Sequence, residues 1–242
     1  MQEKQSATDG GMVKEHKKSK TGLFVDRKRT NVLKSAEQDA LFYLAKMIPG
    51  FITPNILTGI GFFGSLVVLA SFVLGAYVNI YFLAMAIIGL AINWFGDSLD
   101  GRIAYFRNIP RKWYGFSLDI IMDWISTILM GLGFMIYATD GFEPLAYAFV
   151  VFYGWGMIIA QLRYKIADKY TIDSGAVGPT EVRFLIAFIL ILEIFIPTSI
   201  NYCISILTIV LLIININETR KLLILGDQRD RNEKAKATGN EI

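Results

Sequence analysis

The sequence predicts an all-α integral membrane protein, with six transmembrane helices and one amphipathic helix in front of them. Of its 242 residues, 54% are hydrophobic. These residues form apolar runs of roughly the length that a bilayer-spanning helix needs, about 20 residues, separated by short polar links. Lysine and arginine occur on alternate links only, as in a chain that crosses a membrane repeatedly.

The segments follow one another in a simple order. Residues 1–34 form a polar, basic N-terminal segment, residues 35–49 the amphipathic helix, residues 50–216 the transmembrane domain and residues 217–242 a charged tail. The predicted spans are 54–75, 79–99, 116–138, 144–162, 182–197 and 200–216. No apolar core follows the first basic residues before Phe51, so we do not expect a cleaved signal peptide.

The segment 35–49 has the pattern of a short amphipathic helix. Ser35 and Gln38 have the spacing of a capping box. Its apolar residues fall near one helical face: Ala36, Ala40, Leu41, Leu44, Met47 and Ile48. Two interpretations remain open, a helix that lies along the cytoplasmic membrane surface and a helix that packs on the bundle.

The basic residues predict the orientation in the membrane. All 24 Lys and Arg residues lie before the first span, in the links after spans two and four, or in the tail. The links near 75–79, 138–143 and 197–200 have none. Because cytoplasmic loops carry the excess of Lys and Arg, we expect both chain ends in the cytoplasm. Attraction of the basic N-terminal region to anionic lipid is a second reading of the same charges.

Acidic and small residues recur at helical spacing on both sides of the link that contains Pro110. They are Asp97, Asp100, Gly101 and Ala104 before it and Gly115, Asp119 and Asp123 after it. Each set falls on one helical face, and Asn93 joins the first face four residues before Asp97. Because the link is short, we expect two antiparallel neighbouring helices that bring four carboxylates into one small volume.

Such a cluster predicts a divalent-metal site. A single acidic side chain in a membrane helix costs roughly 2.5 to 3.5 kcal/mol, and like charges close together add repulsion. Bound cations would offset both costs, and carboxylate oxygens suit Mg²⁺ or Mn²⁺. The single histidine, His16, and the single cysteine, Cys203, are both far away in the sequence, so neither zinc nor a disulfide is indicated.

Small and polar residues around the aspartates suit a phosphate ligand. At Gly101 and Gly115 the missing side chain would let a nucleotide diphosphate approach the helix backbone, although close helix packing is the competing explanation. Thr53 and Pro54 suit a helix start, which leaves Asn55 and Thr58 available to face a ligand at the cytoplasmic boundary.

In these residues the chain resembles the CDP-alcohol phosphatidyltransferases over about residues 35–216. Their signature is D-x-x-D-G-x-x-A-R, then about eight residues, then G-x-x-x-D-x-x-x-D. Both halves are present here, from Asp97 to Ala104 and from Gly115 to Asp123. The signature arginine is replaced by Tyr105, and the gap is one residue longer than usual, with Arg107 two positions later as the candidate replacement.

The resemblance implies a transferase in which an acceptor hydroxyl attacks the phosphorus of a CDP-linked donor and CMP is released. Two Mg²⁺ or Mn²⁺ ions would be held by Asp97, Asp100, Asp119 and Asp123, with Asp123 also the general base. The residues implied for CDP binding are Asn55, Thr58, Gly101, Ala104, Arg107 and Gly115. Because eukaryotic choline and ethanolamine transferases carry a histidine near the third aspartate, its absence here favours CDP-diacylglycerol as donor.

The same resemblance implies the setting of the reaction. We expect a multi-pass protein of a prokaryotic inner or plasma membrane, with its active site in the cytoplasm, acting as a homodimer. Its partners would be a CDP-linked lipid donor, a small alcohol acceptor and membrane lipids, and not nucleic acid.

The acceptor is less well defined by the sequence. Residues flanking spans four and five at the depth of the aspartates are candidates for its binding: Arg163, Lys165, Glu181 and Arg183. They favour a phosphorylated or acidic acceptor, unless they serve only the positive-inside pattern. The segment 113–127 instead resembles bacterial phosphatidylcholine synthases, which indicates choline. Glu193 is expected to meet lipid headgroups on the far side.

Two other functions compete with this interpretation. A membrane prenyltransferase also binds Mg²⁺ through aspartates, but it would need more spans and two distant acidic motifs. An ion or proton transporter could use intramembrane aspartates. Against it, all four aspartates gather at one boundary, with no acidic path continuing outward.

Overall fold

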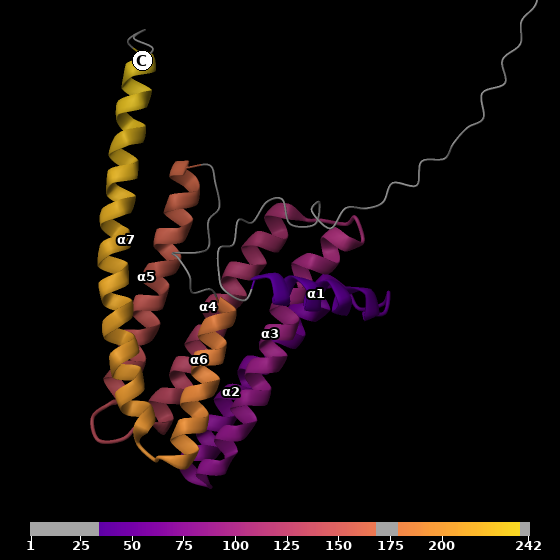
Figure 1. Cartoon of the computed structure of the whole chain (residues 1–242), viewed down its shortest axis with the longest axis vertical. Helices are drawn as coiled ribbons and strands as arrows, with labels where there is room; N and C mark the ends of the chain where they lie inside the picture. Colours follow the sequence, from indigo (N-terminus) through magenta and orange to yellow (C-terminus); the bar gives the residue numbers. More distant parts are fainter. Residues whose placement is uncertain (1–33, 168–178, 238–242) are drawn as a thin grey trace, which may run out of the picture.

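The structure, a computed structural model, describes residues 34–167 and 179–237, and these are helical without any strand (Figure 1). The predicted N-terminal segment up to residue 33, with His16, lies outside the described residues. The elements are α1 (Lys34–Met47), α2 (Pro54–Tyr77), the short 3-10 helix η2 (Ile80–Phe82), α3 (Leu83–Phe106), α4 (Lys112–Tyr137), α5 (Glu143–Ala167), α6 (Pro179–Phe195) and α7 (Ser199–Ala237).

Five of these elements are long and apolar enough to cross a membrane: α2, η2 with α3, α4, α5 and α7. The all-helical membrane architecture is therefore confirmed. The fifth predicted span, 182–197, corresponds to α6, which has 17 residues and is the one predicted span outside this group of five. This length is at the lower limit for a spanning helix, so length alone does not establish a count of six.

The six long helices close into a ring. Helix α2 packs on α3 and α4, α3 also packs on α6, α4 packs on α5, and α7 packs on both α5 and α6. The prediction that α3 and α4 are direct neighbours is wrong in this respect, because both pack on α2 and touch each other little. Helices α3 and α4 are thus connected mainly through α2, and the aspartates lie between these two helices.

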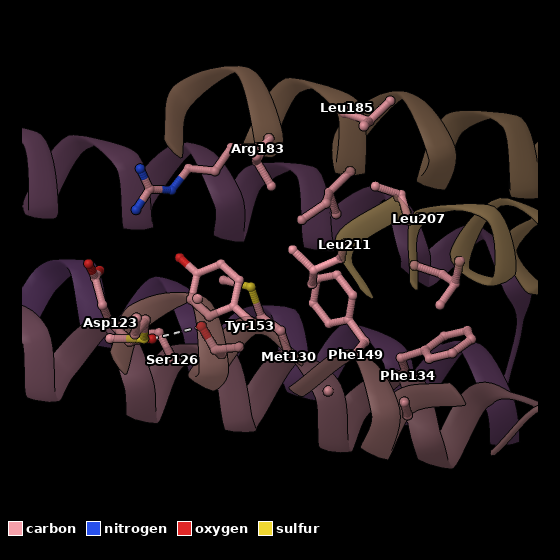
Figure 2. A pocket seen from close by; sticks show the side chains of 18 of the residues that line it. Asp123, Ser126, Met130, Phe134, Phe149, Tyr153, Arg183, Leu185, Leu207 and Leu211 are labelled. Carbon is pink, nitrogen blue, oxygen red and sulfur yellow. Dashed lines mark hydrogen bonds between the residues drawn. The ribbon is translucent and has the colours of Figure 1, made fainter. Parts of the chain in front are cut away.

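An apolar cavity of about 330 Å³ lies inside this ring (Figure 2). Its wall includes residues of each of the six ring helices. Interiors of proteins are normally packed without voids of this size, so the cavity is a distinctive feature of the fold.

Glycines bring α2 and α3 into close contact. A Cβ atom on Gly64 would lie 2.5 Å from the Gly89 carbonyl oxygen, and one on Gly96 would collide with the Gly61 nitrogen and the Leu57 oxygen. Membrane helices approach closely where small residues face each other. This contact fixes the α3 aspartates relative to the start of α2.

Helix α1 lies across the end of the bundle and packs on α3 (Figure 1). Leu41 and Ala45 are buried in one cluster with Leu99 of α3. Tyr43 and Met47 are 64% and 62% exposed, so Met47 does not belong to the packed face that was predicted. The helix packed on the bundle is thus the better of the two interpretations, with an outer face left for the membrane surface.

Helix α7 continues well past residue 216, where the predicted span ends, and projects beyond the other helices (Figure 1). Its polar part is supported by ion pairs between Arg229 and Glu233 and between Arg231 and Asp227, both 2.8 Å long and one helical turn apart. Arg229 also donates to the carbonyl oxygen of Ile166 over 2.6 Å, which ties α7 to the end of α5.

Glu193, at the far end of the ring, does not meet headgroups as expected, because it is only 2% exposed. Its carboxylate accepts hydrogen bonds from the Tyr137 hydroxyl at 2.7 Å and from the backbone nitrogens of Thr198 and Ile200 at 2.9 and 2.8 Å. The first N–H groups of a helix have no partner within it, and Glu193 supplies one for α7. The residue therefore joins α4, α6 and α7.

Candidate active site

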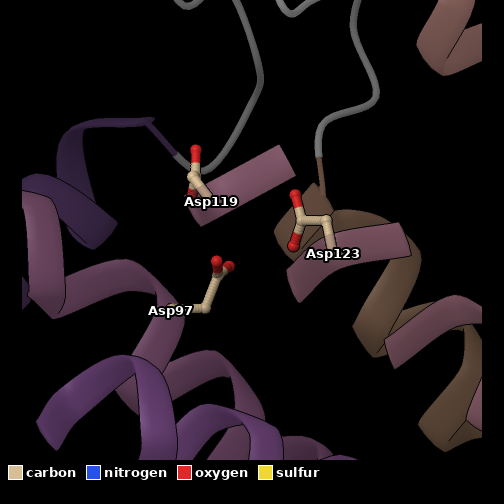
Figure 3. A group of neighbouring side chains, drawn as sticks. All are labelled: Asp97, Asp119 and Asp123. Carbon is tan, nitrogen blue, oxygen red and sulfur yellow. The ribbon is translucent and has the colours of Figure 1, made fainter. Parts of the chain in front are cut away.

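Three aspartates converge where α3 and α4 face each other (Figure 3). One carboxylate oxygen each from Asp97, Asp119 and Asp123 lies within 4.8 Å of the other two. Asp97 comes from α3, and the other two come from α4. The i, i+4 spacing of Asp119 and Asp123 places both on the side of α4 that faces Asp97.

Asp100 belongs to the same recess but has its own partners. All four aspartates line this recess. The Oδ2 atom of Asp100 accepts a hydrogen bond from the Thr58 hydroxyl at 2.7 Å, and its Oδ1 accepts one from the Gly101 nitrogen at 2.5 Å. Thr58, predicted to face a ligand, thus holds Asp100 from α2.

A cation from α6 reaches the cluster as well. Arg183 donates to Asp97 over 2.7 Å and to the Asn93 side-chain oxygen over 2.9 Å. Asn93 in turn donates to the Gly61 carbonyl oxygen and to the Ser65 hydroxyl, each at 3.1 Å. Asn93, expected only as a supporting group, therefore connects α2, α3 and α6 beside the aspartates.

The donor atoms suit a hard divalent cation. Two oxygens that bind the same Mg²⁺ lie at most about 4.2 Å apart, since each bond is about 2.1 Å long. The separations of up to 4.8 Å between the three carboxylates are close to this limit. Within the described ranges the cluster includes neither histidine nor cysteine, so its chemistry fits Mg²⁺ or Mn²⁺ better than zinc.

The two signature glycines border open space. A Cβ atom on Gly101 or Gly115 would meet no heavy atom within 4 Å, in contrast to one on Gly64 or Gly96. Close helix packing therefore does not explain Gly101 and Gly115. Ala104, on the same face of α3 as Gly101, is 9% exposed and packed.

The segment that departs from the signature contacts the link before α2. Tyr105 is 43% exposed. The Arg107 guanidinium donates to four backbone carbonyl oxygens, those of Ile52 at 2.6 Å, Pro49 at 2.8 Å, Ile48 at 3.1 Å and Gly50 at 3.4 Å. Arg107 thus joins α3 to the α1–α2 link, and a role in CDP binding stays a prediction.

Two residues that the sequence did not single out lie at the same rim. Arg111 donates to the Asn55 side-chain oxygen over 2.6 Å, and the Asn55 amide donates to the Tyr114 hydroxyl over 3.3 Å. The Arg111 guanidinium also lies 4.1 Å from the centre of the Tyr114 ring. The signal that could have found Arg111 is a cation four residues before the open Gly115.

The predicted acceptor residues fall into two groups. Arg163 and Arg183 line the large cavity, together with Asp123. Arg163 forms an ion pair with Glu218 at 2.5 Å, and Glu218 also accepts from Lys221 at 2.7 Å. The other two candidates, Lys165 and Glu181, are not part of the cavity wall.

The aspartate recess and the large cavity meet at one boundary. Asn93, Asp123 and Ser126 belong to the walls of both. Beyond Asp123, Figure 2 shows Tyr153 with its hydroxyl directed toward Asp123 and Arg183. The cavity could not be predicted from the sequence, because most of the residues that line it are ordinary apolar positions on separate helices.

Together these features define a helical membrane protein with a cluster of carboxylates that could hold a divalent cation. Polar side chains and two glycines that border open space lie beside this cluster. The sequence model of the CDP-alcohol phosphatidyltransferase family matches residues 51–215, more than half of the chain, and the chain belongs to this family of transferases. The resemblance seen in the motif is thereby confirmed, and the prenyltransferase and transporter alternatives are set aside. No curated protein sequence matches the chain.

Proposed function

We propose that the protein transfers a phosphatidyl group from CDP-diacylglycerol to the hydroxyl group of an alcohol and releases CMP. The observation that carries this proposal is the convergence of the signature aspartates from α3 and α4 in one recess. The donor is inferred from the resemblance, since no histidine lies near Asp119 in the sequence.

The reaction needs one proton acceptor and one set of phosphate-binding groups. The acceptor oxygen attacks the phosphorus that carries the diacylglycerol, and a new P–O bond forms. The bond from this phosphorus to the bridging oxygen breaks, and CMP leaves with the electron pair. The hydroxyl proton goes to the Asp123 carboxylate, which we assign as general base because it borders both the recess and the cavity.

The remaining aspartates would hold the metal. Asp97, Asp100 and Asp119 are proposed as ligands, with Asp123 as a shared ligand and Thr58 fixing the rotamer of Asp100. Two Mg²⁺ or Mn²⁺ ions, when bound, would neutralise the diphosphate charge and stabilise the leaving oxygen.

The CDP moiety is proposed to lie over the open glycines. Gly101 and Gly115 leave space for it, and Asn55 with its partner Arg111 lies at the same rim. A guanidinium binds phosphate oxygens in a bidentate fork, so Arg111 is a candidate for the diphosphate contact that the signature arginine makes in relatives.

The membrane setting is part of the proposal. We infer that α6 also spans the membrane, which gives six spans, and that the protein is a homodimer. We further infer that both chain ends and the aspartates lie on the cytoplasmic side of a prokaryotic inner or plasma membrane. The distribution of Lys and Arg over alternate links supports the orientation.

A direct assay tests the proposed function. Purified protein is incubated with Mn²⁺ or Mg²⁺, CDP-diacylglycerol and a panel of alcohols, and CMP release is measured with and without EDTA. We expect CMP release that depends on both acceptor and metal. The absence of CMP with every acceptor, and also with CDP-choline plus diacylglycerol, would refute the proposal.

A further inference from the structure

The cavity inside the helix ring has a polar end and a long apolar part. Asp123 and Arg183 lie at one end, and the wall beyond Tyr153 is formed by side chains such as Phe149, Phe134 and Leu207 (Figure 2). Its volume of about 330 Å³ is within the range of ligand pockets. Apolar side chains that border a space of this size lack partner atoms on that side, and a hydrocarbon chain would supply them.

The charges at the polar end balance. Among the described residues, the charged side chains of the cavity wall are two acids, Asp123 and Glu218, and two bases, Arg163 and Arg183. Arg163 is paired with Glu218 at 2.5 Å and Arg183 with Asp97 at 2.7 Å. Because both guanidinium groups already have carboxylate partners, this end suits an uncharged hydroxyl better than an acceptor with a phosphate group.

The position of Asp123 indicates which of the two substrates binds in the cavity. Along α4, the open Gly115 lies eight residues before Asp123, a distance of about 12 Å at 1.5 Å per residue. Most of the cavity wall on α4 follows Asp123, from Ser126 to Phe134, and only Ile120 lies before it. The proposed CDP site and the cavity therefore lie on opposite sides of the proposed base, and in-line displacement requires the attacking oxygen opposite the leaving group.

We propose that the cavity binds a hydrocarbon chain of the acceptor, so that the acceptor is a lipid alcohol whose hydroxyl lies at Asp123. This inference rests on the proposed function and changes one part of it, because the sequence alone led us to expect a small alcohol. The chain would lie inside the ring beside Tyr153, Phe149 and Leu211, within the apolar depth of the bundle.

The first experiment compares acceptors that share a glycerol hydroxyl but differ in their chains. The protein in nanodiscs with Mn²⁺ and CDP-diacylglycerol receives dioleoylglycerol, dihexanoylglycerol, glycerol or glycerol 3-phosphate, and a parallel arm uses CDP-choline as donor. We expect CMP release with long-chain alcohols and at least roughly tenfold lower kcat/KM for short-chain or chain-free ones, since each lost methylene contact weakens transition-state binding.

A cavity-filling variant tests the location. Leu211→Trp replaces an aliphatic side chain of the cavity wall with a larger aromatic one. Ile209→Trp introduces the same aromatic side chain on the outer face of α7, where Ile209 is 58% exposed. We expect Leu211→Trp to raise KM for the long-chain acceptor roughly tenfold and to leave KM for CDP-diacylglycerol unchanged. Ile209→Trp should change neither value, and thermal unfolding of both variants checks that they are folded.

A photoreactive label gives a readout that does not depend on turnover. A lipid alcohol with a diazirine in its chain is irradiated with the protein, and labelled peptides are identified by mass spectrometry. We expect labels on the α5 and α7 residues of the cavity wall, reduced in Leu211→Trp. Labels confined to outward-facing residues would overturn the inference.

Two outcomes separate the inference from the proposed function. CMP release with glycerol or glycerol 3-phosphate but not with lipid alcohols would refute the lipid acceptor and keep the transferase. A rise in KM for CDP-diacylglycerol alone in Leu211→Trp would assign the cavity to the donor chain and overturn the inference. The absence of CMP under every condition would refute the proposed function itself.

Discussion

The two halves of the helix ring are packed in different ways. Between α2 and α3, backbones meet through glycines such as Gly64 and Gly96, and the Asn93 amide makes two hydrogen bonds from α3 to α2. Around α4, α5, α6 and α7, the side chains instead leave a cavity of about 330 Å³. Asp123 lies where the two halves meet.

The difference separates two requirements of the proposed reaction. Metal ligands need fixed positions. Backbone contact between α2 and α3 fixes the helix that carries Asp97 and Asp100, and the Thr58 hydroxyl donates to Asp100 at 2.7 Å. A lipid substrate needs room, and the other half provides it at a cost in packing contacts. We call α2 with α3 the tight half, and α4 to α7 the loose half. The following changes test whether the tight half positions the site and the loose half does not.

The largest effect is expected at the boundary of the two halves. Asp123→Asn keeps the shape of the side chain but removes a proton acceptor, so we expect CMP release to fall roughly 10²- to 10⁴-fold with little change in thermal unfolding. Asp140→Asn is the matched control, because Asp140 is exposed on the link between α4 and α5. Full activity in Asp123→Asn would rule out Asp123 as an essential base.

A pair of glycine substitutions compares the packing of α2 on α3 with the space that is proposed for CDP. Gly96→Ala would push a methyl group into the backbone of α2, so we expect a loss of about 1–3 kcal/mol in the free energy of unfolding. Gly101→Ala adds the same methyl group to open space, where alanine favours the helix by about 1 kcal/mol.

The two variants are measured by thermal unfolding in detergent and by KM for CDP-diacylglycerol. We expect Gly101→Ala to raise KM without loss of stability, because the methyl group occupies space proposed for CDP. Equal stability losses in both variants would contradict the distinction between the packed and the open glycines.

The sequence predicted the parts of this comparison that depend on local spacing. Helix positions follow from apolar runs, and the aspartates were placed on shared faces because residues four apart lie on one side of a helix. The long-range pairs could not be read in this way. The pairs of Arg183 with Asp97, of Arg107 with the α1–α2 link and of Glu193 with the start of α7 join residues that are between 5 and 86 positions apart in the sequence.

The cavity and the ring are the clearest examples of this limit. A short link predicts that its two helices lie close together, but the glycines of α2 and α3 create a tighter contact that places α2 against both α3 and α4. A void is a property of all the surrounding helices at once, so no single apolar run indicates it.

A smaller effect is expected from the buried amide of the tight half. Asn93→Ala would remove the acceptor for the Nε atom of Arg183 and both contacts to α2, and the aspartate cluster would lose part of its support. We expect kcat to fall roughly tenfold with KM nearly unchanged, as is usual when a group behind metal ligands is removed.

Asn201→Ala serves as the control for Asn93→Ala. Asn201 is 4% exposed and Asn93 is 5% exposed, but Asn201 lies on α7 at the far end of the ring. Steady-state kinetics of both variants should show the loss of kcat only for Asn93→Ala. The same loss in both would mean that general destabilisation, and not support of the cluster, explains the effect.

The smallest effect is expected from Arg107, and it tests whether this arginine supports the fold or binds CDP. Arg107→Ala removes four hydrogen bonds to the α1–α2 link, and we expect the free energy of unfolding to fall by about 1 kcal/mol because the side chain is only partly buried. KM for CDP-diacylglycerol should stay unchanged, whereas Arg111→Ala should raise it. A higher KM with unchanged stability in Arg107→Ala would instead make Arg107 the replacement for the signature arginine, since a diphosphate contact affects donor binding and not the attachment of α1.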